Sequence, residues 1–268
     1  MLLLTTLLLL TLLIALPAYT IYRPPHLLIR YFQHRWPDTL WHVAVPAGPG
    51  TRPTIALTID DAPSAYTGEI LQVLKANDAK ATFFVIGAQI AAAAAAGPGG
   101  GQGMLENLVR EGMELGNHAM SDRPSRDLSD AVLEAEVLGV QGWIERVYDR
   151  VFQDQDHGDG NGVRRHHFFR PGSGFFSERM RTLIHRLGLR IALGSVYPHD
   201  AQISWPRVNA WHILSMVRSG DIIVCHDRRG WTVPMLKRVL PELKRRGFRV
   251  VTLSELVELG EQTAARKS

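Results

Sequence analysis

Short apolar segments alternate with segments of helical periodicity from residue 54 almost to the end of the chain. The apolar runs that predict strands lie at residues 54–59, 81–87, 115–118, 168–170, 190–194, 222–226 and 249–253. The stretches that predict helices lie at residues 68–77, 104–111, 127–148, 178–187 and 233–246. This repetition is typical of a parallel sheet covered by helices, so we predict an α/β fold closed or nearly closed into a barrel.

Polar side chains stand where these predicted strands end. They are Asp60 with Asp61, His118, Arg170, and His226 with Asp227. In a barrel, the loops that leave the C-terminal ends of the strands converge on one rim, where active sites are assembled. One such residue alone is more often structural, as a helix cap or a satisfied core group. Their repetition at the same place in successive units favours a catalytic site.

Three residues near this rim offer ligands for a divalent metal ion. An open catalytic site needs about three N or O ligands and a water molecule whose pKa the ion lowers. Asp61, His118 and Asp122 supply such a set, and the last two are four residues apart, on one face if the chain turns helically there. The only cysteine is Cys225, which excludes an internal disulfide and a cysteine-based zinc site.

The remaining rim residues suit proton transfer. Asp60 stands beside the predicted ligand Asp61 and can take a proton from that water. His226 comes from a distant strand and can protonate a leaving amine from the other side. Together these residues predict metal-assisted hydrolysis of an amide.

Six segments extend this interpretation. They are TIDDAPS (58–64), ATFFVIG (81–87), GMELGNHAM (112–120), FRPGSG (169–174), IIVCHD (222–227) and LPELKRRGFRVVTLSEL (240–256). In order and spacing they resemble the motifs of the polysaccharide deacetylase family, the NodB-homology or carbohydrate esterase 4 group that includes chitin deacetylases. The resemblance covers about residues 51–257. It implies a distorted (β/α) barrel of the NodB type that removes N-acetyl groups from N-acetylglucosamine polymers or peptidoglycan.

The resemblance also implies roles for the metal-site residues. Asp60 resembles the general base, Asp61 the metal-binding carboxylate and His118 the first metal histidine. Asp122 stands where the family has a second histidine, so the predicted donor set is harder and more anionic than usual. The resemblance implies a divalent ion, with zinc expected and cobalt or manganese as alternatives.

Further roles follow from the later motifs. Arg170 resembles the arginine that holds the base, and Pro171 with Ser173 belongs to the groove motif. Ser173 replaces the usual aromatic residue, but its backbone N–H could still serve as an oxyanion donor. His226 resembles the catalytic acid, and either Asp200 or Asp227 could orient it. We count Asp200, with Asp60, Arg170 and His226, as a predicted catalytic residue.

The N-terminal segment predicts a membrane anchor. Residues 2–22 carry no charge, and ten of the first sixteen residues are leucine. As a helix of roughly 32 Å they could cross a bilayer core of about 30 Å. We expect one transmembrane helix over residues 1–22 and a single-pass membrane localisation. The alternative is a secretory signal, which would direct the protein to the secretory pathway or the cell surface.

The rest of the chain is assigned by composition. Residues 23–50 predict a linker rich in proline and aromatic residues, residues 51–260 the catalytic domain, and residues 261–268 a tail. The low-complexity stretches 91–103 and 153–162 predict surface loops. Acids in the second stretch do not match the spacing of an EF-hand calcium loop.

Charge and composition limit the partners. Lysine and arginine exceed the acidic residues by four, without a dense basic cluster that would indicate nucleic-acid binding. We expect an N-acetylated polysaccharide or oligosaccharide substrate, above all chitin or chitooligosaccharides, and a membrane contact through the N-terminal helix. The alternatives are a carbohydrate-binding pseudoenzyme without metal and a hydrolase of another non-peptide C–N bond. The sequence does not predict an oligomeric state.

Overall fold

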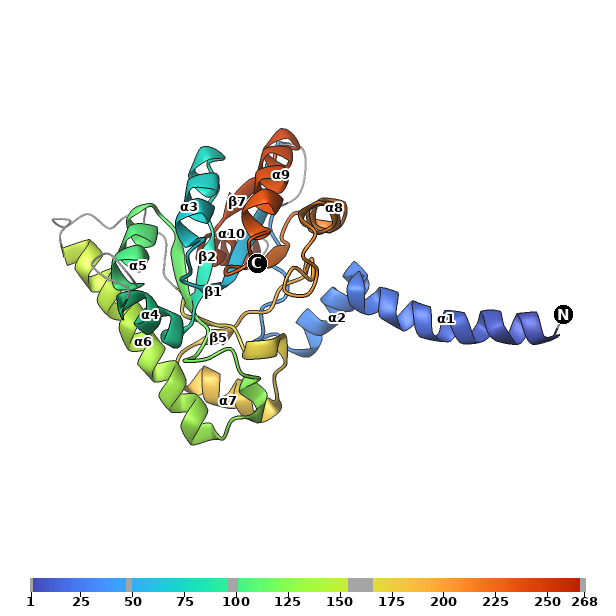
Figure 1. Cartoon of the computed structure of the whole chain (residues 1–268), viewed down its shortest axis with the longest axis horizontal. Coiled ribbons are helices and arrows are strands. Elements are labelled where there is room, and N and C mark those ends of the chain that lie inside the picture. Colours follow the sequence, from blue (N-terminus) through green and yellow to red (C-terminus); the bar gives the residue numbers. More distant parts are fainter. Residues whose placement is uncertain (1, 47–49, 96–100, 154–165, 266–268) are drawn as a thin grey trace.

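A parallel sheet of seven short strands forms the centre of the molecule (Figure 1). The computed structural model describes residues 2–46, 50–95, 101–153 and 166–265. The strands are β1 (Thr54–Ala62), β2 (Thr82–Val85), β3 (Glu114–Asn117), β4 (Phe168–Phe169), β5 (Arg190–Ile191), β6 (Ile222–His226) and β7 (Arg249–Val251). Their order is β5-β4-β3-β2-β1-β6, and β7 pairs with the beginning of β1.

Helices surround this sheet in Figure 1, and α1 projects away from it. The α-helices are α1 (Leu2–Tyr22), α2 (His26–Arg35), α3 (Thr67–Ala76), α4 (Gly87–Ala95), α5 (Gly101–Arg110), α6 (Asp130–Gln153), α7 (Glu178–Arg186), α8 (Pro206–Met216), α9 (Thr232–Arg245) and α10 (Leu253–Ala265). Two short 3-10 helices, η1 (Ser125–Asp127) and η2 (Gly172–Gly174), lie in the loops that follow β3 and β4.

A segment that precedes β1 joins the two edges of the sheet. Leu40 pairs with Ala192 just beyond β5, and His42 pairs with Asp221 just before β6. The N–H of Val43 donates to the carbonyl of Gly220 at 3.0 Å, next to the same edge. The predicted distorted (β/α) barrel is therefore confirmed. The division of the chain into a linker at residues 23–50 and a catalytic domain at residues 51–260 stays a prediction.

Strand β1 pairs with β2, β6 and β7 and is buried along its whole length. Its apolar side chains belong to the core, as expected for a parallel strand covered on both faces. The strand continues through Asp60 and Asp61 to Ala62, three residues beyond the predicted end. The two aspartates thus extend from a paired strand, which restricts their positions more than a loop would.

Several helices were missed or misplaced by the sequence patterns. The stretch 91–103 was expected to be a loop, but residues 91–95 continue α4 and residues 101–103 begin α5. Alanine has the highest helix propensity, which explains why an alanine-rich run extends a helix here. Helices α2, α8 and α10 were not predicted, and α8 begins with Pro206 in its first turn, where proline is tolerated. The stretch 154–162 lies outside the described residues.

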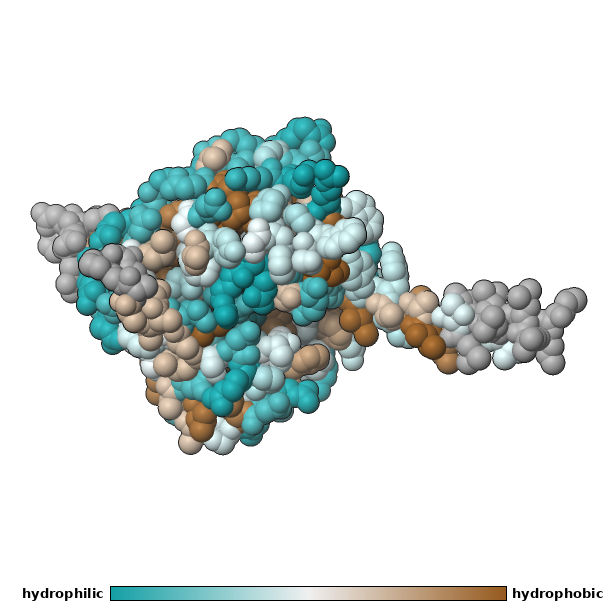
Figure 2. Space-filling model, viewed as in Figure 1, coloured by the Kyte–Doolittle hydropathy of each residue, from teal (hydrophilic) through white to brown (hydrophobic). Residues whose placement is uncertain are grey.

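The predicted membrane anchor requires a correction. A spanning helix needs about 20 consecutive and mostly apolar residues. In the part of the chain that the structure describes, no helix combines the required length with the required hydropathy. The predicted single-pass membrane localisation is therefore wrong, and the predicted transmembrane helix and membrane contact are not supported. Figure 2 shows the described end of α1 leaving a domain whose visible face is largely hydrophilic.

Candidate active site

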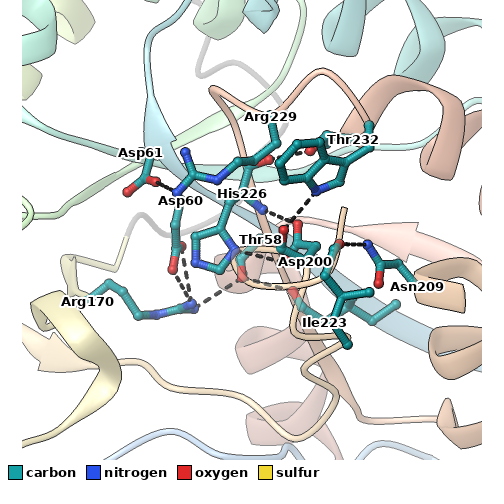
Figure 3. A network of polar contacts seen from close by, with 12 residues as sticks. Thr58, Asp60, Asp61, Arg170, Asp200, Asn209, Ile223, His226, Arg229 and Thr232 are labelled. Carbon is teal, nitrogen blue, oxygen red and sulfur yellow. Dashed lines mark hydrogen bonds and ion pairs between the residues drawn. The ribbon is translucent and has the colours of Figure 1, made fainter. Parts of the chain in front are cut away.

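The predicted site residues meet at the rim formed by the C-terminal ends of the strands. Asp60 and Asp61 lie near the end of β1, His118 follows β3, Arg170 follows β4, and His226 ends β6. Strands β1 and β6 pair in a register that sets Asp60 opposite His226. Figure 3 shows that residues from β1, β6 and the loop after β4 form one polar network.

Asp60 and Arg170 form a buried ion pair. Nη1 of Arg170 donates to Oδ1 of Asp60 at 3.1 Å and to Oδ2 at 2.9 Å, and each residue is less than 5% exposed. The guanidinium also lies over the ring of Phe84, 4.4 Å from its centroid. Burial lowers the pKa of Arg170 despite the neighbouring charge of Asp60. Arg170 thus restricts the orientation of the predicted base.

Thr58 is a member of this network that the sequence analysis missed. Its hydroxyl accepts a hydrogen bond from Nη2 of Arg170 at 3.1 Å and donates to the carbonyl of Ile223 at 2.8 Å. Because side chains alternate along a strand, Thr58 points to the same side of β1 as Asp60. The two-residue spacing between Thr58 and Asp60 was the sequence signal that could have identified Thr58.

The three predicted metal ligands converge. Asp61, His118 and Asp122 each offer a ligand atom, and these atoms lie within 4.8 Å of one another. Nε2 of His118 is 3.6 Å from Oδ1 of Asp61. Asp61 and His118 are buried, whereas Asp122 is exposed on the loop that follows β3. The backbone of Asp61 is left-handed, with φ of 66°, which turns the chain at the rim.

The donor atoms suit a divalent cation. Among the described residues, neither carboxylate oxygen of Asp61 has a hydrogen-bond partner, although both are buried. Nδ1 of His118 donates to the carbonyl of Arg170 at 2.7 Å, which leaves Nε2 as the ring nitrogen available to an ion. Buried oxygens without a partner are costly unless a cation or water compensates them. The residues present therefore fit the ion that the sequence implied.

The pKa shifts reflect this concentration of charge. Burial raises the pKa of Asp61, but the nearby positive charges, His118 foremost, outweigh burial and lower it. Burial also opposes the protonation of His118, but Asp61 and Asp60 outweigh it and raise the pKa of the imidazole. Partial burial and the negative charge of Asp61 raise the pKa of Asp122. A cation bound between the two carboxylates would relieve their repulsion.

His226 is oriented by Asp200. Nδ1 of His226 lies 2.8 Å from Oδ1 of Asp200, and the backbone N–H of His226 donates to Oδ2 at 2.8 Å. Burial lowers the pKa of His226, but the hydrogen bond and charge of Asp200 outweigh it and raise this pKa to about 9. The imidazole is therefore protonated at neutral pH.

Asp227, the other expected partner of His226, has a different environment. Its Oδ1 accepts from Ser64 at 2.5 Å, and Oδ2 accepts from Thr67 at the beginning of α3. Asp227 thus joins the loop after β6 to the loop after β1. Of the two candidates, Asp200 is the one that contacts the imidazole.

The groove motif forms the short helix η2. Pro171 is buried, whereas Ser173 is exposed and has a φ of 63°. Gly172 packs so closely against the carbonyl of Arg123 that a Cβ atom would lie 2.1 Å from its oxygen, so only glycine fits there. This packing holds η2 against the loop that carries Asp122.

Three further residues near the site were missed by the sequence analysis. Nη2 of Arg229 lies 3.5 Å from Oδ2 of Asp61, and Nε1 of Trp231 donates to the carbonyl of Asp200 at 2.8 Å. The ring of Tyr197 contacts His226 edge-on, with centroids 5.7 Å apart. Their only sequence signal was proximity to His226 or Asp200 along the chain.

The arrangement can perform amide hydrolysis by acid–base catalysis. One buried carboxylate held by an arginine and one protonated imidazole held by a carboxylate extend from neighbouring strands. Such a pair can accept a proton from an attacking water and donate one to a leaving group. Asp61 and His118 beside them can hold a cation that stabilises negative charge.

Comparisons with known proteins identify the family of this chain. The sequence profile of the family described as polysaccharide deacetylase matches residues 47–192. The chain is 30% identical over 215 residues to a peptidoglycan-N-acetylglucosamine deacetylase of Bacillus cereus, across 78% of this chain and 90% of the relative. It is 28% identical over 226 residues to a chitooligosaccharide deacetylase of Bradyrhizobium, across 77% of this chain and 91% of the relative.

A solved structure shares the fold. The peptidoglycan deacetylase PdaC from Bacillus subtilis superposes with a TM-score of 0.67 at 26% sequence identity, covering 82% of this chain and 97% of that structure. The profile match, the relatives and the barrel lead to the same assignment. The chain belongs to the polysaccharide deacetylase family and is a hydrolase that acts on non-peptide carbon–nitrogen bonds.

Proposed function

We propose that this protein removes N-acetyl groups from an N-acetylglucosamine-containing polysaccharide, most of all chitin or chitooligosaccharides, and that it depends on a divalent metal ion. The observation that carries this proposal is the convergence of two proton-transfer groups and three potential metal ligands on one rim. The matched relatives act on peptidoglycan and chitooligosaccharides by name, which supports an N-acetylated glycan as the substrate class.

In this proposal Asp61, His118 and Asp122 hold the ion. Zinc is the expected ion, with cobalt or manganese as alternatives because a second carboxylate makes the donor set harder. When bound, the ion would lower the pKa of a water molecule and polarise the acetamide carbonyl.

The chain's own residues move the protons. Asp60, oriented by Arg170, accepts the proton of the attacking water. The backbone N–H of Ser173 stabilises the negative charge that develops on the carbonyl oxygen. His226, held by Asp200, then donates its proton to the departing amine. The products are acetate and a glucosamine residue.

Acetate release from a panel of chitooligosaccharides and peptidoglycan, with and without a chelator, tests the proposal. We expect release that stops on chelation and returns when one divalent ion per chain is restored. Full activity after confirmed metal removal would overturn the metal dependence. Release from peptidoglycan alone would reassign the substrate.

A further inference from the structure

The end of α1 lies against the loop that carries Asp200. Tyr22, the last residue of α1, is half-buried, whereas the side chains from Leu13 to Tyr19 are exposed. Its ring stacks on His199, with centroids 5.0 Å apart and planes 23° apart. It also contacts His212 of α8 edge-on, with centroids 4.7 Å apart. The aromatic side chain thus sits between two elements of the barrel.

A hydrogen bond reinforces this contact. Nε2 of His199 lies 3.2 Å from the carbonyl oxygen of Tyr22, to which it can donate. The last carbonyls of a helix have no partner within the helix and are commonly satisfied from outside. Arg23, the next residue, lies over the ring of Trp211 in α8, 4.7 Å from its centroid. Backbone, ring and guanidinium therefore all contact the same part of the barrel.

His199 is held in an unfavourable backbone conformation. Its φ is 59°, in the left-handed region that residues other than glycine rarely adopt. Such a conformation persists only where the surroundings determine it. Tyr22 provides His199 with both a stacked ring and a hydrogen-bond acceptor. The residue that follows His199 in the chain is Asp200.

A continuous set of contacts then leads to the proposed acid. His199 meets Tyr197 edge-on, with centroids 4.7 Å apart, and Tyr197 meets His226 edge-on at 5.7 Å. Asp200 binds both the imidazole and the backbone N–H of His226. The contact with α1 is thus separated from His226 by one layer of side chains.

We propose that Tyr22 is a positioning residue, which fixes the loop 197–200 and through it the orientation of the His226 imidazole. The proposal rests on the proposed role of His226 as the acid that protonates the leaving amine. In this proposal the end of α1 supports catalysis through Tyr22, and the rest of the helix is not required for that role. Loss of the Tyr22 ring should therefore impair the step that needs the acid and leave other steps nearly intact.

The test compares three full-length variants. Tyr22→Ala removes the ring, Tyr22→Phe keeps it, and Tyr19→Ala removes an exposed ring of the same helix as the matched control. Two substrates are used: an N-acetylated chitooligosaccharide, and 4-nitrophenyl acetate, whose phenolate leaves without protonation. We expect Tyr22→Ala to lower kcat about 10-fold on the first substrate, with KM nearly unchanged, and less than about 2-fold on the second. Tyr22→Phe and Tyr19→Ala should match the parent.

Hydrogen exchange provides a readout that does not need activity. The backbone N–H of His226, which donates to Asp200, should exchange faster in Tyr22→Ala than in the parent and the control. Equal losses on both substrates, or unchanged exchange at His226, would overturn the proposal. If the parent releases no acetate from any amide, the proposed function fails, and the exchange result alone decides whether Tyr22 positions the loop.

Discussion

The guanidinium of Arg170 donates two hydrogen bonds to the carboxylate of Asp60, 110 residues earlier in the chain, and both side chains are buried. Strand β1 supplies the carboxylate, and the loop after β4 supplies the guanidinium. A carboxylate held in this way keeps one orientation, which is a property required of a general base.

Breaking this pair should destabilise the protein. Arg170→Ala leaves the charge of Asp60 buried without a partner, and we expect the free energy of unfolding to fall by about 3–5 kcal/mol. Urea titration followed by circular dichroism measures this loss. Arg245→Ala, which breaks an exposed pair with Glu242, is the control and should change stability little. Equal effects of the two variants would contradict the buried character of the Asp60 pair.

Removing the proposed base should separate catalysis from metal binding. Asp60→Asn keeps the size of the side chain and its contact with Arg170, but it cannot accept the proton. We expect acetate release to fall by about 10²-fold or more, while the metal content stays at the parent level. Measuring the metal content together with the rate shows whether Asp60 acts as a base or as a metal ligand. A loss of metal equal to the loss of rate would make Asp60 a ligand.

The ligand set can be tested at its unusual member. Asp122→Ala should weaken binding of a divalent ion at least about 10-fold, because even residues that only support a ligand cost 10–100-fold. Asp122→His restores the donor set that the family resemblance implies and should retain activity with a changed preference among zinc, cobalt and manganese. Competition titration against a chromogenic chelator measures the affinities. An unchanged affinity of Asp122→Ala for the ion would show that Asp122 is not a ligand.

The pH dependence should identify the proposed acid. The pKa of His226 is raised from 6.5 to about 9 by Asp200, so the protonated form required for catalysis persists until the pH passes about 9. We expect a bell-shaped profile of kcat/KM whose basic limb lies near pH 9. Asp200→Asn removes the negative charge and should move that limb toward pH 6.5. Asp227→Asn, whose carboxylate binds Ser64 and Thr67 instead, is the control and should leave it in place.

The same shift has a consequence for stability. Because the pKa of His226 is higher in the folded protein than its ordinary value, the pair with Asp200 stabilises the fold fully below pH 6.5. This contribution is lost as the pH rises through about 9. The difference in unfolding free energy between the parent and His226→Gln should therefore be larger at pH 6 than at pH 10. A constant difference across this range would contradict the raised pKa.

Much of the catalytic rim was predictable because strand periodicity and strand ends are local properties. An apolar run followed by Asp60 and Asp61, and another followed by His226, are visible in a few adjacent residues. Parallel strands point the same way, so their ends must meet at one rim whatever the details of packing. The family motifs then indicated the same residues and the same barrel.

The choice between Asp200 and Asp227 as the partner of His226 depended on tertiary structure. Asp227 is adjacent in sequence, but its carboxylate binds α3 and the loop before it, whereas Asp200 approaches from a loop 26 residues away. The closure of the barrel also depended on tertiary structure, because Leu40 pairs with Ala192 and His42 with Asp221. These contacts join segments that are distant in the chain, and local composition carries no information about them.

The sequence by itself determined the α/β repetition, the rim and the chemical types of the residues on it, because periodicity and strand ends are local. The pairing of Arg170 with Asp60 agrees with what the family motif implied. Only the tertiary structure decided that Asp200 rather than Asp227 holds His226, and that Tyr22 stacks on His199. It also contradicted the predicted single-pass membrane localisation and showed that a predicted alanine-rich loop is partly helical. The physical reason is that pairing is set by distance in space, which depends on the packing of the whole barrel.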